Sequence, residues 1–444
     1  MESKKVLNGD LPRIIFLIAM FLVEGIPYTL LVTSYLINLK KHYNYSEIGV
    51  IQMCSFAIPC KIIFSTMVQN WNWKLFGEKK SWIIPTSIWI GAIFIYLGFS
   101  INSIHTEKRY YMLTFLFSLI MMCMGIHEIA LSSWSISLLK KENIGYAASW
   151  KVLGNYVGSF ISGWLFYSLN SVEFCNSYIY NSPKSNPIID DQDFMFYVGI
   201  YWIVASAVWF LLYDEKEDQN PDIQVKRNFH QLISVASNMI CNKNLLFLFT
   251  FVICSRMFLY TNGILGLPYI FSELKHDKTI YSIATLVSFP FDILTATLAG
   301  NYGKTNTLNK YYLWFWLNIV IDIIVIHLLY EHYSFFTGIS SYLFNIIFLI
   351  CYIAFNSISI FRNCMIQTFF NSNCDRSMTS LQISIFSTVL NFSSHVSKLY
   401  GFTFADQYGI FLPNKIWIVI ESTFLIYWYH KLSKIQKEGL YQKN

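Results

Sequence analysis

The chain has 444 residues, of which 55% are hydrophobic and 13% are charged, whereas soluble domains carry roughly 25% charged residues. This composition excludes an ordinary soluble protein and is typical of a polytopic membrane protein. The net charge of +6 comes mostly from residues in loops and not from one basic block, so it does not indicate binding to nucleic acid.

Apolar stretches of about 20 to 28 residues recur along the chain, and each is long enough to cross a hydrocarbon core of roughly 30 Å. The first stretch is too long for the core of a signal peptide and lacks an obvious small-x-small cleavage site, so we expect a permanent span. The predicted fold class is an all-α polytopic membrane protein. Its twelve predicted spans are Leu11 to Leu36, Ile48 to Gln69, Trp82 to Ile101, Tyr111 to Leu139, Gly145 to Ser168, Phe194 to Tyr213, Leu245 to Ile270, Ile280 to Gly300, Tyr311 to Tyr330, Ser341 to Ile366, Thr379 to Thr403 and Ile410 to His430.

The longest charged segment, "DEKEDQNPDIQVKRNFH", divides these spans six and six. We therefore predict an N-terminal six-helix bundle over residues 1–213, a cytosolic linker over 214–244 and a C-terminal six-helix bundle over 245–444. With the N-terminus in the cytosol, nineteen Lys and Arg residues of the loops lie on the cytosolic side and eight on the other. This excess predicts that both termini are cytosolic.

The cysteines give no sign of a bound metal. All nine are scattered, most of them inside predicted spans, and neither a disulfide framework nor a zinc-ligand spacing is present. The adjacent His127 and Glu128 also lack the second histidine of an HExxH site. The sequence therefore predicts no metal and no cofactor.

Ten ionisable residues lie inside the predicted spans. The cations are Lys61, Lys151, Arg256, Arg362 and Lys398, and the acids are Glu24, Glu128, Asp292, Asp322 and Glu421. A charge facing lipid costs about 2.5 to 3.5 kcal/mol, so we expect most of them to face the protein interior or a wet cavity. Lys61, Arg362 and Glu421 could instead extend to the membrane surface.

Helical spacing places several polar residues on common faces. These faces are Lys151, Gly154, Asn155, Gly158 and Ser162 on the fifth span, Gly125, Glu128, Ser132 and Ser135 on the fourth, Arg256, Tyr260 and Gly263 on the seventh, Asn356, Ser359, Asn363 and Gln367 on the tenth, and Ser387, Asn391, Ser394, His395 and Lys398 on the eleventh. Stripes of small residues also serve close helix packing, which remains the alternative for each face. Pro27 and Pro290 predict either interrupted helices near a substrate site or simple kinks.

His127 and Glu128 are neighbours within the fourth span, and adjacent helical positions point about 100° apart. We therefore expect them to serve different faces. Glu128 either neutralises an interior lysine, Lys151 being the nearest candidate, or acts as a proton-binding or gating acid with His127 titrating nearby.

Five segments in order, "FLVEGIPYTL", "SFAIPCKIIFSTMV", "FGEKKSWIIPT", "HEIALSSWSISLLKKENIGYAA" and "EFCNSYI", resemble the acetyl-coenzyme A transporter family of the major facilitator superfamily. In the second half, mainly "ICSR" and "STVLNFSS" agree. The family pattern has Gln-Asp where this chain has His127-Glu128, and Gln where it has Glu24, so the acid is retained at Glu128. The resemblance implies a two-bundle transporter that carries acetyl-coenzyme A from the cytosol into the lumen of the endoplasmic reticulum.

Acetyl-coenzyme A carries phosphate charges, an adenine ring and a thin pantetheine arm, and interior cations suit its phosphates. We therefore expect an integral membrane solute carrier that is surrounded by lipid and binds acetyl-coenzyme A or a similar anion. The sequence leaves the oligomeric state of the protein open. Predicted substrate-binding residues are Lys61, Lys151, Asn155, Arg256, Tyr260, Asn391, His395 and Lys398. Predicted proton-coupling or gating residues are Glu24, His127 and Glu128.

Other functions remain possible from the sequence. The chain could transport another organic anion, such as a nucleotide-linked metabolite, or a muropeptide-like solute. A membrane-embedded acyltransferase could use His127 or His395 as a base, but no nucleophile-base motif appears, so we expect a transporter and not an enzyme. A scaffold or receptor would not need so many interior charges.

Overall fold

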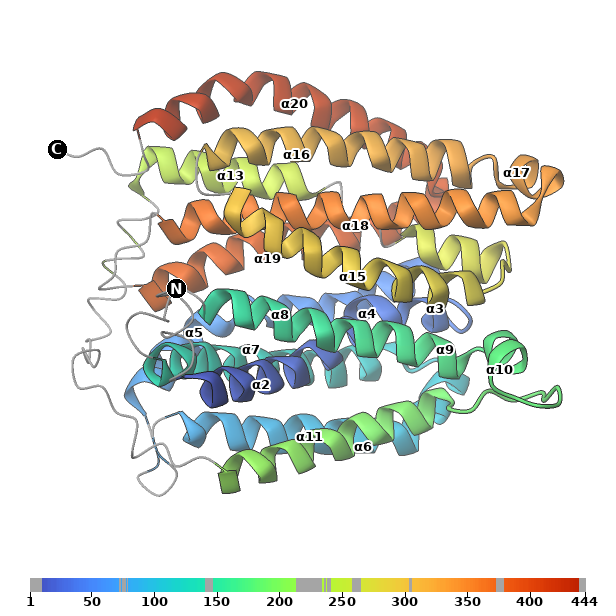
Figure 1. Cartoon of the computed structure of the whole chain (residues 1–444), viewed down its shortest axis with the longest axis horizontal. Coiled ribbons are helices and arrows are strands. Elements are labelled where there is room, and N and C mark those ends of the chain that lie inside the picture. Colours follow the sequence, from blue (N-terminus) through green and yellow to red (C-terminus); the bar gives the residue numbers. More distant parts are fainter. Residues whose placement is uncertain are drawn as a thin grey trace. The chain divides into compact units, whose positions relative to one another are not determined.

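A computed structural model describes residues 10–71, 73, 77, 79–139, 147–212, 234, 237, 241–257, 265–302, 306–372 and 379–438. Apart from an isolated bridge between Trp73 and Gly77, these residues form helices and the turns between them (Figure 1). The prediction of an all-α fold is confirmed. Most of the predicted linker, residues 214–233, and the predicted site residue Tyr260 lie outside the described residues.

The internal contacts divide the chain into two compact units. The N-terminal unit comprises Met1–Tyr35 and Met53–Leu232, and the C-terminal unit comprises Leu36–Gln52 and Ile233–Asn444. The segment Leu36–Gln52 belongs by sequence to the predicted N-terminal bundle, but it packs with the C-terminal unit.

The N-terminal unit is built from helices joined mostly by short turns. Its α-helices are α2 (Leu11–Thr29), α5 (Lys61–Asn70), α6 (Lys80–Thr106), α7 (Tyr110–Leu138), α8 (Ala147–Phe160), α9 (Phe166–Asn170), α10 (Val172–Tyr178) and α11 (Asp191–Leu212). A π-helical turn, Leu30–Ser34, extends α2, another, Ile161–Leu165, joins α8 to α9, and a 3-10 turn, Met53–Ala57, precedes α5.

Glycines bring two helices of this unit, α2 and α8, close together. A Cβ on Gly154 would lie 2.7 Å from the carbonyl oxygen of Ile18, and a Cβ on Gly158 would lie 3.0 Å from the Cα of Gly25. The glycines of α8 therefore let its backbone touch that of α2, as small residues do between membrane helices. For these two positions the packing interpretation of the predicted polar face is correct.

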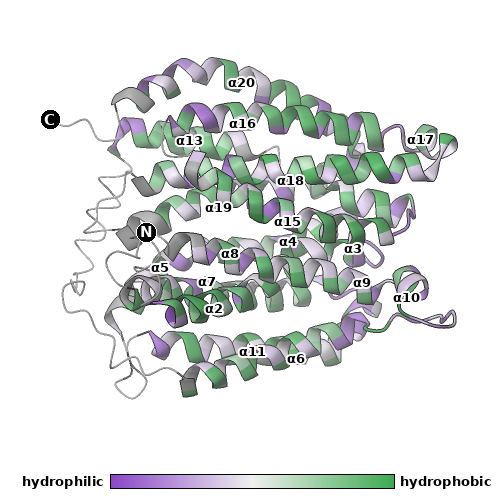
Figure 2. Cartoon of the chain, viewed as in Figure 1, coloured by the Kyte–Doolittle hydropathy of each residue, from purple (hydrophilic) through white to green (hydrophobic). Residues whose placement is uncertain are grey.

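The C-terminal unit holds the remaining helices. They are α3 (Leu36–Leu39), α4 (Tyr45–Gln52), α13 (Lys243–Met257), α15 (Thr279–Tyr302), α16 (Thr307–Asp322), α17 (Tyr333–Ile339), α18 (Ser341–Ser372), α19 (Thr379–Tyr408) and α20 (Phe411–Glu438). π-Helical segments at Tyr269–Glu273 and Ile323–Tyr330 lie before α15 and after α16. Hydrophobic residues predominate along α16 and α18, whereas the connection after α10 in the other unit is hydrophilic (Figure 2).

The core of the C-terminal unit combines aromatic and aliphatic side chains, most of them from α13, α16, α18, α19 and α20. Phe315, Phe370 and Trp428 are buried in it, and the Phe370 ring stacks on Phe386 with centroids 4.2 Å apart. Such large side chains bury much apolar area per residue, and they fix the positions of the five helices around one another.

The segment Leu36–Gln52 docks on this unit through polar contacts. The hydroxyl of Ser46 donates to Asp406 Oδ2 at 2.6 Å, and the hydroxyl of Ser272 donates to the carbonyl oxygen of Ile37 at 3.0 Å. On α4, Gly49 faces Phe402 so closely that a Cβ would lie 3.2 Å from that of the phenylalanine. These contacts explain why the segment belongs to the C-terminal unit.

Six helical stretches among the described residues are long and apolar enough to cross a membrane. They are Leu11–Leu39, Lys80–Thr106, Tyr110–Ser135, Thr279–Ala299, Thr307–Tyr330 and Ser341–Phe370. The predicted second span is instead divided into α4 and α5 by a 3-10 turn and a turn at Pro59. Conversely, α2 continues through Pro27 and α15 through Pro290, so an interruption at either proline is wrong.

Candidate functional site

The carboxylate of Glu128 on α7 binds two lysines from two other helices. Lys61 Nζ donates to Glu128 Oε2 at 2.9 Å, and Lys151 Nζ donates to Glu128 Oε1 at 2.6 Å. Lys151 also donates to the hydroxyl of Ser132 at 3.0 Å. We call Lys61, Glu128 and Lys151 the two-lysine cluster.

Local sequence explains how α5 and α7 meet here. Pro59 cannot continue a helix, and α5 begins two residues later, at Lys61. Gly125, one turn before Glu128, faces this lysine so closely that a Cβ would lie 3.3 Å from that of Lys61. The predicted polar face of the fourth span thus forms the lysine contact through Gly125, Glu128 and Ser132.

Within the two-lysine cluster one carboxylate faces two ammonium groups, and Glu24 on α2 also acts electrostatically on Lys151. The Lys61 side chain is 3% exposed, whereas those of Glu128 and Lys151 are 24% and 27% exposed. A buried ammonium must be paired, and Glu128 supplies that pair for Lys61. Lys151 is therefore the more exposed cation of the cluster.

His127 faces a different set of helices from Glu128, as their spacing predicts. Its side chain is fully buried, and its ring centroid lies 5.3 Å from that of Trp202 and 5.7 Å from that of Trp209 on α11. Its Nδ1 lies 3.8 Å from Glu24 Oε1 on α2. This pair is an ionic contact when His127 is protonated. The two tryptophans around the histidine are a feature that periodicity alone did not indicate.

Of the remaining predicted residues, Asn155 shares α8 with Lys151, whereas the others that the structure describes lie on α13 and α19. Asn155 lies one turn after Lys151 on α8, and its Oδ1 has no hydrogen-bond partner among the described residues. On α19, Asn391 is partly buried, and His395 and Lys398 are 1% and 2% exposed. Arg256 is the second-last residue of α13, and its side chain lies outside the described part of the structure.

The alternative in which Lys61, Arg362 and Glu421 extend to the membrane surface is wrong. The three residues are 3%, 4% and 3% exposed, so they lie inside the protein. Sequence position alone left extension to the membrane surface open for these three residues, because burial by neighbouring helices depends on the tertiary structure.

The fold is that of major facilitator transporters. It aligns with the crystal structure of the nucleoside transporter NupG at a TM-score of 0.62, with 12% sequence identity, over 96% of this chain and 98% of that one. More specifically, a family model described as acetyl-coenzyme A transporter 1 matches residues 13–245, which is more than half of the chain. The chain belongs to this acetyl-coenzyme A transporter family.

Two sequence relatives extend the comparison. An uncharacterized membrane protein of Saccharomyces cerevisiae is 28% identical over 236 residues, which are 49% of this chain and 42% of that protein. The anhydromuropeptide permease of Escherichia coli K12 is 24% identical over 168 residues, which are 37% of this chain and 33% of the permease. The chain thus matches less than half of the length of either relative. The family and its solved neighbours are transporters, in agreement with the expectation that the chain is not an enzyme.

Proposed function

We propose that the protein moves acetyl-coenzyme A, or a related polyanionic coenzyme A or nucleotide-linked metabolite, from the cytosol into an organelle lumen by alternating access. Its twelve spans would form two six-helix bundles with both termini in the cytosol, and its membrane would be that of the endoplasmic reticulum, as the family implies. The observation that carries the proposal is the two-lysine cluster with its more exposed Lys151.

Phosphate recognition is the step that this cluster explains. An arriving phosphate would exchange with Glu128 at Lys151, whose side chain is 27% exposed, while Glu128 keeps its bond to the buried Lys61. Charge-assisted hydrogen bonds of this kind are among the stronger ones in proteins. The buried Lys61 therefore keeps its ion pair while the more exposed lysine binds the substrate.

The other predicted residues complete the proposed site. Arg256, Lys398 and His395 would bind further phosphate or adenine atoms, with Asn155, Tyr260 and Asn391 as polar neighbours. Glu24 and His127 would act in gating or proton coupling. His127 Nδ1 lies 3.8 Å from Glu24 Oε1, and protonation of the histidine turns this contact into an ion pair.

A second candidate substrate is another organic anion or a muropeptide-like solute. It is favoured by the 24% identity to the Escherichia coli anhydromuropeptide permease. Both candidate substrates are anionic, so the two-lysine cluster alone does not discriminate between them. Competition does: the transported solute, added unlabelled, should reduce uptake of the label.

The test is uptake of radiolabelled acetyl-coenzyme A by the full chain in proteoliposomes. Wild-type protein should accumulate label inside the vesicles with time. Lys151→Ala should lower the affinity about 10- to 100-fold, since one charge-assisted hydrogen bond is worth roughly 1.5 to 3 kcal/mol. Folding should persist because Lys61 still neutralises Glu128.

Lys184→Ala is the matched control, because it removes an exposed lysine that lies over the Tyr180 ring in the same unit. It should leave uptake unchanged. Equal uptake by Lys151→Ala and wild type would remove Lys151 from the site. Transfer of label to an acceptor without accumulation would instead indicate an enzyme.

A further inference from the structure

Ser132 lies beside the two-lysine cluster and differs from other hydroxyl residues of α7. Thr114 and Ser118 donate to carbonyl oxygens one turn earlier in the helix, at 2.8 Å and 2.7 Å, and Ser135 donates to the carbonyl oxygen of Ser132 at 2.7 Å. The Ser132 hydroxyl instead accepts a hydrogen bond from Lys151 Nζ at 3.0 Å and donates to no acceptor among the described residues. A helical serine can satisfy its hydroxyl on a carbonyl of its own helix, so Ser132 keeps a donor for another partner.

Two hydrogen-bond donors of this site have no acceptor in the part of the chain that the structure describes. An ammonium group has three N–H donors, and a hydroxyl has one donor beside its acceptor lone pairs. Lys151 uses one N–H on Glu128 Oε1 and one on the Ser132 oxygen, so a third N–H remains, together with the hydroxyl hydrogen of Ser132. Lys151 Nζ and Ser132 Oγ lie 3.0 Å apart, close enough to bind two oxygens of one phosphoryl group.

The charges around Lys151 explain why a neutral donor matters here. Glu128 and Glu24 both act electrostatically on this lysine, and Glu128 bonds it at 2.6 Å. These carboxylates weaken the attraction of Lys151 for a further anion. A hydroxyl adds a hydrogen bond without adding charge, and its bond to a phosphate is charge-assisted, so Ser132 can offset part of that repulsion.

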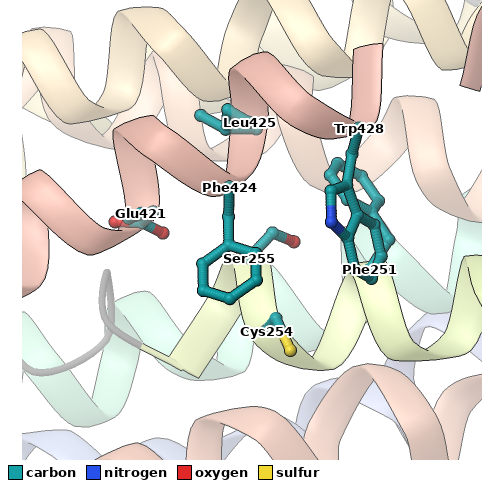
Figure 3. A pocket seen from close by; sticks show the side chains of 7 residues that line it. All are labelled: Phe251, Cys254, Ser255, Glu421, Phe424, Leu425 and Trp428. Carbon is teal, nitrogen blue, oxygen red and sulfur yellow. The ribbon is translucent and has the colours of Figure 1, made fainter. Parts of the chain in front are cut away.

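A small pocket in the C-terminal unit, between α13 and α20, offers a contrast (Figure 3). Its volume is about 10 Å³, which is roughly the room that one water molecule needs. Ser255 in its wall donates to the carbonyl oxygen of Val252 at 3.2 Å, and the charged residue that lines it is the acid Glu421. Size and charge both disfavour a phosphoryl group there, whereas Ser132 combines a remaining donor with a cation.

We propose that Ser132 is a substrate-binding residue that donates a hydrogen bond to a phosphate oxygen, next to the bond from Lys151. When the phosphate exchanges with Glu128, the ammonium keeps its bond to the Ser132 oxygen, while the hydroxyl hydrogen binds the same phosphoryl group. Hydrogen bonds in such a chain polarise and strengthen one another. This inference rests on the proposed transport of a phosphorylated substrate and adds to it a residue that recognises the phosphate.

The test is the affinity of the purified full chain for acetyl-coenzyme A, measured by titration calorimetry. Ser132→Ala should weaken binding about 3- to 10-fold, as loss of one hydrogen bond does. Ser132→Thr keeps the hydroxyl and should lose less than Ser132→Ala. Folding should persist in both variants because Lys151 keeps its bond to Glu128. An unchanged affinity in Ser132→Ala overturns the proposal.

Ser118→Ala is the matched control on the same helix. Ser118 already donates to the carbonyl oxygen of Thr114 and lies about four turns before Ser132. Its replacement should leave the affinity unchanged. A loss equal to that of Ser132→Ala would mean that any missing hydroxyl of α7 disturbs binding, and it would overturn the assignment to Ser132.

Removal of Lys151 separates direct contact with the phosphate from an effect that passes through the lysine. In a Lys151→Ala background, Ser132→Ala should still weaken binding at least about twofold, because the hydroxyl itself makes a hydrogen bond to the ligand. If Ser132 only positioned Lys151, the second substitution would change nothing, and direct binding would be overturned.

Inorganic pyrophosphate distinguishes failure of this inference from failure of the proposed substrate. It presents phosphoryl oxygens without the adenine ring or the pantetheine arm, so Ser132→Ala should weaken its binding too. Pyrophosphate binding that depends on Ser132, without any binding of acetyl-coenzyme A, would overturn the substrate and support the residue. Equal binding of acetyl-coenzyme A by wild type and Ser132→Ala would do the reverse, and if neither probe bound, both proposals would be overturned.

Discussion

Glu128 shows at the scale of single residues how one buried acid organises three helices. Its two oxygens each bind a different lysine, at 2.9 Å from Lys61 and 2.6 Å from Lys151. In one of the two alternatives left open by the sequence, Lys151 was the expected partner of Glu128, because the two residues lie on consecutive spans. The sequence did not predict Lys61, which is 67 positions away along the chain and becomes a neighbour only because α5 begins after Pro59 and packs on α7.

Removal of this carboxylate should destabilise the protein. Glu128→Gln keeps the size of the side chain but leaves two lysines facing each other, and Lys61 is 3% exposed. Breaking a buried ion pair by removing one partner costs about 3 to 5 kcal/mol, and the partial exposure of Lys151 places the expected loss near the lower end. A lower midpoint of thermal unfolding in detergent would show it.

The matched control is Glu107→Gln, which changes an acid that is 49% exposed and pairs with Arg109 in a turn of the same unit. Its effect should stay within about 0.5 kcal/mol. Equal midpoints for the two variants would mean that the two-lysine cluster does not need the Glu128 charge.

At the scale of elements, backbone contact between α2 and α8 positions the residues around the cluster. On α2, Glu24 lies between Leu22 and Gly25, which contact Gly158 of α8. On α8, Lys151 and Asn155 lie on either side of Gly154 in the sequence. The spacing of Gly154 and Gly158 predicted a common face but left packing and substrate binding as alternatives. The structure shows that Gly154 and Gly158 serve helix packing, because a Cβ on either glycine would meet the backbone of α2.

Gly158→Ala should therefore force these two helices apart. The added Cβ would meet the carbonyl oxygen of Leu22 and lie 3.0 Å from the Cα of Gly25, and backbone atoms cannot move aside as a flexible side chain can. Overpacking of this kind typically costs about 1 to 3 kcal/mol. Thermal unfolding measures the loss, and uptake should fall with it because Lys151 moves with α8.

Gly338→Ala serves as its control. Nothing lies within 4 Å of a Cβ at that position in α17, so the same chemical change should leave stability and uptake at the wild-type level. If both alanine variants unfolded at the wild-type temperature, the close approach of α2 and α8 would not be needed for stability.

For the whole molecule, ligand binding should be visible as added stability. A ligand that binds only the folded state at 100 times its Kd adds about 2.7 kcal/mol. Acetyl-coenzyme A should therefore raise the unfolding midpoint, and pantetheine, which lacks the phosphates, should not. The measurement is thermal unfolding of the purified full chain with increasing ligand, and a muropeptide solute provides the competing substrate class.

This comparison separates recognition of the phosphates from recognition of the thin arm. Stabilisation by pantetheine equal to that by acetyl-coenzyme A would contradict a site based on lysines. Repetition with Lys151→Ala should reduce the shift produced by acetyl-coenzyme A, since that variant lacks the more exposed cation of the two-lysine cluster.

The amino-acid sequence alone determined the helical, membrane-embedded class of this protein, because hydropathy and helical period are local properties of the chain. It also indicated that His127 and Glu128 serve different faces, since that follows from 100° per residue. Only the tertiary structure decided which charges meet, that Lys61 and Glu421 are buried, and that Leu36–Gln52 packs with the C-terminal unit. The physical reason is that burial and pairing depend on neighbours from distant helices, which no local pattern specifies.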